Sequence, residues 1–286
     1  MSVYARRRLL AAAAALLAIA AIALAGVVLH GRGGRQASDG PPIGGTGTSG
    51  ALAANVRPEL AASAPRVVAQ PTAIRGDGPL FALHGRVVRR VTPRLRKGRV
   101  ALTFDDGPGP FTLPILRELE SLHAHATFFV VGRNVKLSPG TVRQLRAAGM
   151  VVGNHSWSHP RMTRFGLAVQ RAQMRRTQDI LDQTIGQRPR FFRPPMWAWN
   201  RTTARAVAEQ GMVGVLFSID TRDWSLPGVT AIVRRALAAR DGEIIAFHDG
   251  GGAREQTLQA LPLIVKGLRA RGLEPVTLDE LYVRPA

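Results

Sequence analysis

The sequence has no cysteine among its 286 residues, which excludes thiol catalysis and disulfide bonds. Lysine is scarce as well, with Lys97, Lys136 and Lys266 the only three, although lysine and arginine together number 39. Acidic residues number 19, which leaves a formal net charge of +20. Such a charge predicts attraction to anionic lipid headgroups and wall polymers, and an arginine-biased genome explains it equally well. The chain also lacks a known nucleic-acid-binding motif, so we predict no nucleic-acid partner.

The first 30 residues have the pattern of an export segment. Arg6-Arg7-Arg8 precedes an uninterrupted apolar run from Leu9 to Leu29, long enough to span about 30 Å of hydrocarbon. The flanking arginines predict a cytoplasmic N-terminus, with the rest of the chain outside the cell membrane. Ala23-Leu24-Ala25 fits a small-residue cleavage site. Residues 1–30 are therefore predicted to be either a retained single-pass transmembrane anchor or a signal peptide whose removal gives a secreted protein.

Residues 31–96 are rich in Gly, Pro, Ala and Ser and show little periodicity. This composition predicts a flexible linker, with a short strand or two between Pro79 and Val91. Residues 97–286 are predicted to be one catalytic domain, which is large enough to bury its own core. We expect it to be a monomer.

Seven apolar, β-favouring runs alternate with stretches of helical periodicity in this domain. The runs are Arg99 to Phe104, Ala126 to Val131, Met150 to Val152, Arg190 to Phe192, Val213 to Ile219, Glu243 to Phe247 and Glu274 to Leu278. The helical stretches are Thr112 to His123, Thr141 to Ala148, Leu167 to Ile185, Thr202 to Gln210, Thr230 to Arg240 and Gln256 to Arg271. Alternation of this kind predicts an α/β fold with a parallel barrel or sheet.

Two adjacent carboxylates follow the first strand. Asp105 and Asp106 stand just before Gly107-Pro108, where neighbouring charges are costly unless they share a cation or a proton. His155 and His159 are four residues apart after another apolar run, so a helical turn or a tight loop brings both imidazoles to one side. Two histidines and an aspartate are a ligand set of catalytic zinc. We predict a metal site, although the histidine spacing alone also fits a capped loop.

Other polar residues follow later strands. Arg193 comes after the fourth strand, Asp220 and Asp223 after the fifth, and His248 and Asp249 after the sixth. In a parallel barrel the loops at the carboxyl ends of the strands form the active site, so these side chains are predicted to meet the carboxylates and histidines at one mouth. Each residue taken alone also fits a surface charge, a turn or a flexible loop.

The five segments resemble, in order, the five motifs of the polysaccharide deacetylase family, the carbohydrate esterases of family 4 with a NodB homology domain. The resemblance covers roughly residues 97 to 283. The matching segments are Thr103-Phe104-Asp105-Asp106-Gly107-Pro108, His155-Ser156-Trp157-Ser158-His159, Arg193-Pro194-Pro195, Asp220-Thr221-Arg222-Asp223-Trp224 and Ile244-Ile245-Ala246-Phe247-His248. The family's fold, a distorted (β/α)7 barrel of NodB type, is what the resemblance implies for this chain.

The resemblance also implies roles for individual residues. Asp105 would be the catalytic base, Arg193 would hold that base, and His248 would be the catalytic acid. Either Asp220 or Asp223 could orient His248, and the family favours Asp223. The implied metal is Zn²⁺, with Co²⁺ as an alternative, and its implied ligands are Asp106, His155 and His159.

Residues expected to contact the substrate are Pro195, Met196, Trp197, Trp224 and Phe247. The backbone N–H of Met196 would face the developing oxyanion. Two positions depart from the family's pattern. Met196-Trp197 stands where the family usually has an aromatic residue and then glycine, and Ala246 replaces the usual leucine that lines the acetyl pocket.

We therefore predict a metal-dependent hydrolase that removes N-acetyl groups from glycans of the cell envelope, with peptidoglycan as the expected substrate. Deacetylation of chitin oligosaccharides and O-deacetylation of xylan are alternative activities. A non-catalytic glycan-binding module is an alternative of another class, and loss of Asp105 or His248 would have favoured it. Both residues are present.

Overall fold

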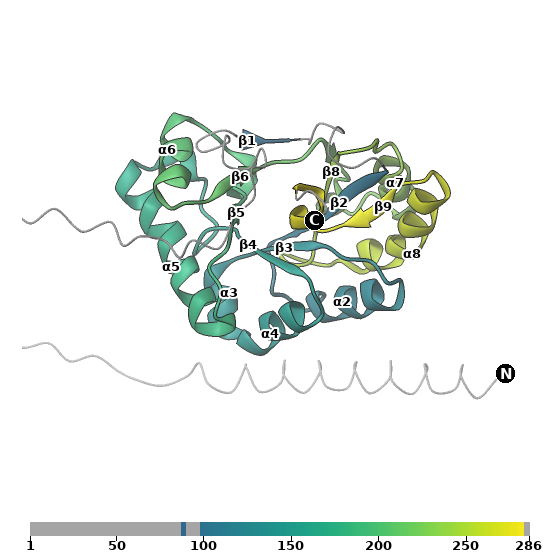
Figure 1. Ribbon diagram of the computed structural model, residues 1–286, viewed down its shortest axis with the longest axis horizontal. Helices are drawn as coiled ribbons and strands as arrows, with labels where there is room; N and C mark the ends of the chain where they lie inside the picture. The colour runs from purple at the N-terminus through teal and green to yellow at the C-terminus, as the bar shows by residue number, and fades with distance from the viewer. Residues whose placement is uncertain (1–86, 90–97, 283–286) are drawn as a thin grey trace, which may run out of the picture. The chain divides into compact units, whose positions relative to one another are not determined.

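The computed structural model describes residues 87–89 and 98–282. Its centre is strand β2 (Arg99–Asp105), which pairs in parallel with three other strands (Figure 1). Strand β8 (Ile244–His248) pairs with residues 101 to 105 of β2. The last part of β2 also pairs with β3 (Thr127–Val130), and its first part pairs with β9 (Glu274–Val276). Both carboxylates of the first motif thus lie at or just after the carboxyl end of the central strand.

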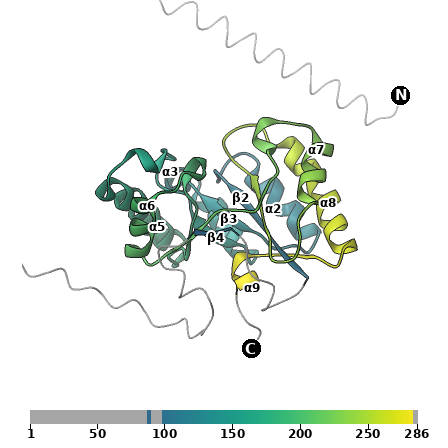
Figure 2. The same ribbon diagram turned by 90° about the horizontal axis from the view of Figure 1, so that it is seen from above.

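The remaining strands extend this sheet in both directions. Its order is β1-β6-β5-β4-β3-β2-β8-β7, and every pairing is parallel. The further strands are β1 (Val87–Val88), β4 (Val151–Asn154), β5 (Phe191–Phe192), β6 (Val213–Val215) and β7 (Ile219–Asp220). Most helices pack on the outside of the curled sheet (Figures 1 and 2). The prediction of a parallel α/β architecture is confirmed.

The sheet differs from the predicted barrel in two respects. It has nine strands in the described residues, and its edge strands β1 and β7 are not paired with each other, so it forms an open half-barrel. The run predicted as one strand from Val213 to Ile219 forms two, because the chain leaves β6, crosses the open side and continues as β7. Strand β1 confirms the short strand predicted between Pro79 and Val91, at the distal end of the predicted linker. It pairs with β6, so the sheet begins before residue 97.

Most helices match their predicted ranges. These are α2 (Thr112–Ser121), α4 (Pro139–Ala147), α5 (Leu167–Ile185), α6 (Arg201–Glu209), α7 (Val229–Ala236) and α8 (Glu255–Ala270). Helix α5 ends at Gly186, whose φ of +63° is a left-handed conformation that glycine adopts without a steric penalty. The short helices α3 (Gly132–Leu137) and α9 (Leu278–Tyr282) were not predicted. Helix α9 begins inside the run predicted as the last strand.

Alternation along β2 separates two layers of side chains. Phe104 lies in the outer core between the sheet and the helices, and it stacks on Phe128 at 5.0 Å between ring centroids. Thr103 and Asp105 have the opposite orientation because successive residues of a strand face opposite sides. They therefore face the inside of the curled sheet. A separate inner cluster, which includes Phe129 and Tyr282, fills that side below the site.

The predicted export segment, residues 1–30, lies outside the described residues, as does most of the predicted linker, 31–96. Within residues 87–89 and 98–282 no helix has both the length and the apolar character needed to cross a membrane.

Candidate active site

Asp106, His155 and His159 converge at the carboxyl ends of β2 and β4. The Nε2 atoms of His155 and His159 lie 3.4 Å and 3.0 Å from Asp106 Oδ1. Each of the three residues offers one potential ligand atom, and these three atoms all lie within 4.8 Å of one another. This is the trio that the sequence pattern predicted, and its donors are the nitrogen and oxygen atoms that zinc and similar divalent metals accept.

The hydrogen bonding of these residues fits a metal. His155 Nδ1 lies 2.7 Å from the backbone carbonyl of Arg193, so Nδ1 carries the proton and Nε2 is left free to ligate. Asp106 Oδ1, to which both imidazoles point, is buried and has no hydrogen-bond partner. Burial raises the pKa of Asp106, but its interactions with His155 and His159 outweigh that effect and hold the pKa far below its usual range. The site therefore offers a cation an ionised carboxylate and the Nε2 atoms of two imidazoles.

Asp105 is fully buried at the end of β2 and is held by Arg193. Arg193 Nη1 donates to Asp105 Oδ1 at 2.9 Å and to Thr103 Oγ1 at 2.8 Å. The second oxygen of Asp105, Oδ2, is buried and has no partner. One oxygen is thus fixed by the guanidinium and the other is left to accept a proton.

Arg193 is itself held on every side. Its Nη2 donates to the carbonyl of Leu216 at 2.9 Å, its Nε donates to the carbonyl of Val215 at 3.3 Å, and its guanidinium lies 4.3 Å from the ring centroid of Phe129. Burial lowers the pKa of Arg193, and the charge of Asp105 opposes that shift. Because β6 ends at Val215, the crossing of the chain from β6 to β7 supplies the carbonyls that orient this arginine.

His248 at the end of β8 is oriented by Asp223. His248 Nδ1 lies 2.8 Å from Asp223 Oδ1, and the backbone N–H of His248 donates to Asp223 Oδ2 at 2.8 Å. Burial alone would lower the pKa of His248, but the hydrogen bond and charge of Asp223 raise it above its ordinary value. Asp220 instead accepts from the backbone N–H of Arg222. Of the two candidates left open by the sequence, Asp223 is the one that contacts the imidazole.

Three further residues also support the site: Thr257 and Thr103, for which no role was predicted, and Asp249, which was predicted to lie at the mouth without a defined role. Thr257, in the first turn of α8, donates to Asp223 Oδ2 at 2.7 Å. Thr103 bridges Arg193 to the backbone of β8 through a 2.7 Å hydrogen bond to the carbonyl of Ile245. Asp249 is fully buried and accepts from Thr112 Oγ1 at 2.5 Å, and burial raises its pKa to about 7. Alternation along β2 could have identified Thr103, whereas no sequence pattern connects Thr257 to the site.

Among the expected substrate residues, the ring of Trp197 lies beside that of His248, and Met196 and Trp224 expose apolar surface. Pro195 is buried and Trp197 is partly buried, whereas Met196 and Trp224 are 47% and 48% exposed. The indole of Trp197 lies 6.3 Å from the His248 ring. Trp197 has a φ of +53°, so it adopts a left-handed backbone at the position where the family usually has glycine. Its side chain therefore stands beside the imidazole where the family pattern has none.

The prediction for Phe247 is wrong. This residue is fully buried in the outer core and stacks on Phe104 at 5.3 Å between ring centroids. His248 faces the inside of the curled sheet, so its neighbour in the strand must face the helices. Phe247 does not line the hollow of about 460 Å³ that opens beside Asp106. Pro110 and Asn134 are among the residues that line this hollow.

A family model described as polysaccharide deacetylase matches residues 92–215. The peptidoglycan-N-acetylglucosamine deacetylase of Listeria monocytogenes is 37% identical over 186 residues, which are 64% of this chain and 39% of the relative. The chitooligosaccharide deacetylase of a Bradyrhizobium species is 35% identical over 64% of this chain and 90% of its own length. A crystal structure of a peptidoglycan N-acetylglucosamine deacetylase superimposes with a TM-score of 0.66 at 31% identity, covering 71% of this chain and 95% of that one.

The chain belongs to the polysaccharide deacetylase family. It spans less than half the length of the Listeria relative, which contains further sequence outside the matched region.

Proposed function

We propose that this protein is a metal-dependent hydrolase that removes N-acetyl groups from peptidoglycan. The observation that carries the proposal is that two ionisable side chains accompany the trio of potential metal ligands, each held by its own partner. Arg193 holds Asp105, and Asp223 holds His248. A glycan-binding module has no need for a buried, unpartnered carboxylate oxygen beside a histidine whose pKa is raised. Relatives named as peptidoglycan deacetylases support the choice of substrate.

Asp106, His155 and His159 would hold the metal, and zinc is the proposed ion because two imidazoles and one carboxylate leave a position open. When bound, a divalent cation would supply Lewis-acid activation of a water molecule and of the acetamide carbonyl. The Nδ1 hydrogen bond of His155 to the carbonyl of Arg193 leaves Nε2 free to ligate. Arg193 thus links the ligand set to the base, because its carbonyl accepts from His155 while its guanidinium holds Asp105.

The proton transfers follow from the two supported side chains. Asp105 Oδ2 accepts the proton of the attacking water, since Oδ1 is occupied by the guanidinium of Arg193. His248 gives a proton from Nε2 to the departing amine, which is a poor leaving group unless it is protonated. Asp223 accepts from Nδ1 and so fixes which nitrogen faces the substrate. Trp197 and Trp224 would provide the apolar walls for the acetyl group and the sugar.

Mass spectrometry of glycans treated with the purified full chain and Zn²⁺ tests the proposal. Peptidoglycan fragments should lose acetyl groups, each replaced by hydrogen, faster than chitin oligosaccharides or acetylated xylan do. Faster deacetylation of the chitin oligosaccharides would contradict the choice of peptidoglycan and would instead support the activity for which the Bradyrhizobium relative is named. No acetyl loss from any of the three would contradict the hydrolase proposal.

We further propose that the protein acts outside the cytoplasmic membrane, tethered by residues 1–30. The support is the pattern of Arg6-Arg7-Arg8 followed by the apolar run to Leu29. Protease added to intact spheroplasts should digest the catalytic unit, while the digested protein's N-terminal part stays with the membrane fraction. Recovery of the intact protein from the cytosol after this treatment would contradict the proposal.

A further inference from the structure

The turns that follow β2 and β8 lie against each other beside Asp106, the anionic member of the ligand trio. The backbone N–H of Asp249 donates to the carbonyl of Asp105 at 3.0 Å, which continues the pairing of the two strands past their ends. Asp106 has a φ of +78°, a left-handed conformation that is uncommon outside glycine. A residue in this conformation keeps its place only where the surrounding groups hold its backbone.

The two turns are packed so closely that neither has space for another side chain at the contact. A Cβ atom added at Gly107 would lie 2.1 Å from Asp249 Oδ2, and one added at Gly250 would lie 2.2 Å from the backbone oxygen of Asp106. Both distances are shorter than a van der Waals contact allows, so glycine is required at both positions. The carboxylate of Asp249 therefore touches the backbone directly after Asp106.

Asp249 also ties the loop after Asp106 to the start of helix α2. Thr112 Oγ1 donates to Asp249 Oδ2 at 2.5 Å and accepts from the backbone N–H of Gly109 at 2.8 Å. Asp249 and Thr112 are both fully buried, so water does not replace these hydrogen bonds when one partner is removed. A chain of hydrogen bonds thus runs from Asp249 through Thr112 to the loop that carries Asp106.

The turn that contains Asp249 is itself held in place. Arg254 is 4% exposed, and its Nε donates to the carbonyl of Gly250 at 3.0 Å. On another side, Asn134 Nδ2 in helix α3 donates to the backbone carbonyl of Asp106 at 3.0 Å. The backbone at Asp106 is therefore held between helix α3 and the turn after β8.

We propose that Asp249 is a positioning residue, which holds Asp106 where its carboxylate meets the two histidines of the trio. It acts through Thr112 and through the backbone of Gly107, and it is not itself one of the three ligands. The proposal rests on the proposed function only in taking this trio to be a metal site. Substitution of residues behind a metal ligand typically lowers metal affinity by about 10- to 100-fold.

The affinity for Zn²⁺ tests the proposal. It is measured on the full chain by competition with a chromophoric chelator, at a temperature where circular dichroism shows each variant to be folded. Asp249→Ala should lower the affinity about tenfold or more, because the loop after Asp106 loses its support. Thr112→Val should do the same, whereas Thr112→Ser keeps the hydroxyl and should bind Zn²⁺ as the wild type does. The double variant should lose little more than either single variant, because the two residues act as one unit.

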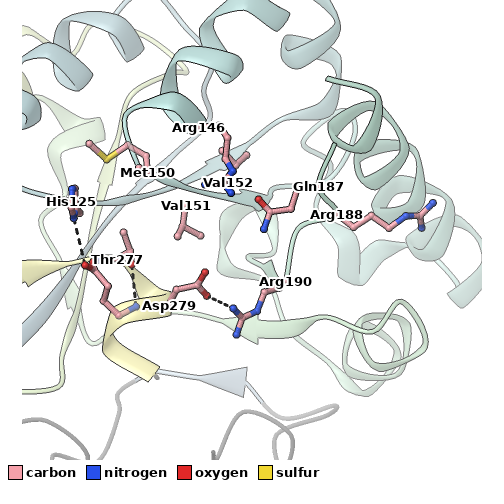
Figure 3. Close-up of a pocket in the computed structure, with 12 residues that line it drawn as sticks. His125, Arg146, Met150, Val151, Val152, Gln187, Arg188, Arg190, Thr277 and Asp279 are labelled. Carbon is pink, nitrogen blue, oxygen red and sulfur yellow. Dashed lines mark hydrogen bonds and ion pairs between the residues drawn. The ribbon is translucent and has the colours of Figure 1, made fainter. Parts of the chain in front are cut away.

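Thr277→Val is the matched control. Thr277 is also buried at the start of a helix, where its Oγ1 accepts from the backbone N–H of Glu280 at 3.1 Å. It helps to line a hollow of about 270 Å³ at the amino ends of β3 and β4, the edge of the sheet opposite the metal trio (Figure 3). This variant should unfold at a lower temperature, because it loses a helix cap, and its Zn²⁺ affinity should stay unchanged.

Unchanged Zn²⁺ affinity in Thr112→Val would overturn the proposal, as would an equal loss of affinity in Thr277→Val. Thr112→Val alters one buried group without changing its shape, so it decides the question even where Asp249→Ala does not fold. Acetate release is measured in parallel on each protein. The predicted losses of Zn²⁺ affinity without acetate release from any glycan, even by the wild type, would contradict the proposed function and still support the positioning role.

Discussion

Asp105 and His248 occupy directly paired positions on the adjacent parallel strands β2 and β8. Their side chains therefore leave the sheet on the same side, a strand spacing of about 4.8 Å apart at the backbone. Each is held by its own partner from a different part of the chain, Arg193 for Asp105 and Asp223 for His248. The register of two strands thus fixes the separation between the proposed base and the proposed acid.

The two adjacent aspartates should respond differently to removal of their charge. Asp106→Asn should lower metal affinity, since Asp106 contributes the anionic ligand of the trio. Asp105→Asn should retain the metal and lower turnover by roughly 10² to 10⁴, the usual contribution of a general base. Metal content by elemental analysis and turnover on one acetylated oligosaccharide distinguish the variants. Metal loss in Asp105→Asn with metal retained in Asp106→Asn would reverse the assigned roles.

The fall in turnover at alkaline pH should follow the loss of the proton from His248. His248 must be protonated to act as the acid, and Asp223 raises its pKa above the ordinary value. Activity should therefore persist through neutral pH and fall only as the pH rises past this raised pKa. Asp223→Asn removes the charge that raises it, so in that variant the fall should begin at lower pH. An alkaline limb that does not move would show that another group limits the rate there.

Asp220, at the end of β7, and Asp223, three residues later, provide a matched pair of substitutions. Asp223→Asn should lower kcat, because Asp223 accepts hydrogen bonds from both Nδ1 and the backbone of His248. Asp220→Asn should leave kcat close to the wild-type value, because Asp220 contacts the backbone of Arg222 instead. Steady-state kinetics of the two variants on the same substrate make the comparison. A larger loss of kcat in Asp220→Asn would show that the wrong aspartate was assigned.

Phe247 should behave as a core residue. Phe247→Ala should lower the free energy of unfolding by about 3 to 5 kcal/mol, because it leaves a cavity beside Phe104 in the outer core. The KM of any variant that still folds should change little. Trp224→Ala is the comparison, since an exposed indole contributes little to the core and its loss should raise KM instead. Denaturant unfolding and kinetics together test this, and a stable Phe247→Ala protein with a raised KM would contradict it.

The sequence predicted the convergence of the site well, because parallel strands place their carboxyl ends together whatever the distance along the chain. Asp106 and His155 are 49 positions apart and still meet. The sequence does not show that the apolar run 213–219 forms two strands, because both halves of the run are apolar. Only the curvature of the sheet separates β6 from β7. The orientation of Phe247 could have been inferred from that of His248. The contact of Thr257 with Asp223 depends on how α8 packs, which no local pattern encodes.

The proposed hydrolysis is tested most directly by acetate release from an acetylated peptidoglycan fragment, measured for the full chain and for Asp105→Asn with Zn²⁺ supplied to both. The wild-type protein should release acetate in step with the appearance of free amines. The variant should keep its zinc and release acetate roughly 10² to 10⁴ times more slowly, because Oδ2 of Asp105 no longer accepts a proton. Equal rates for the two proteins, or no acetate from the wild type at full zinc occupancy, would contradict the mechanism.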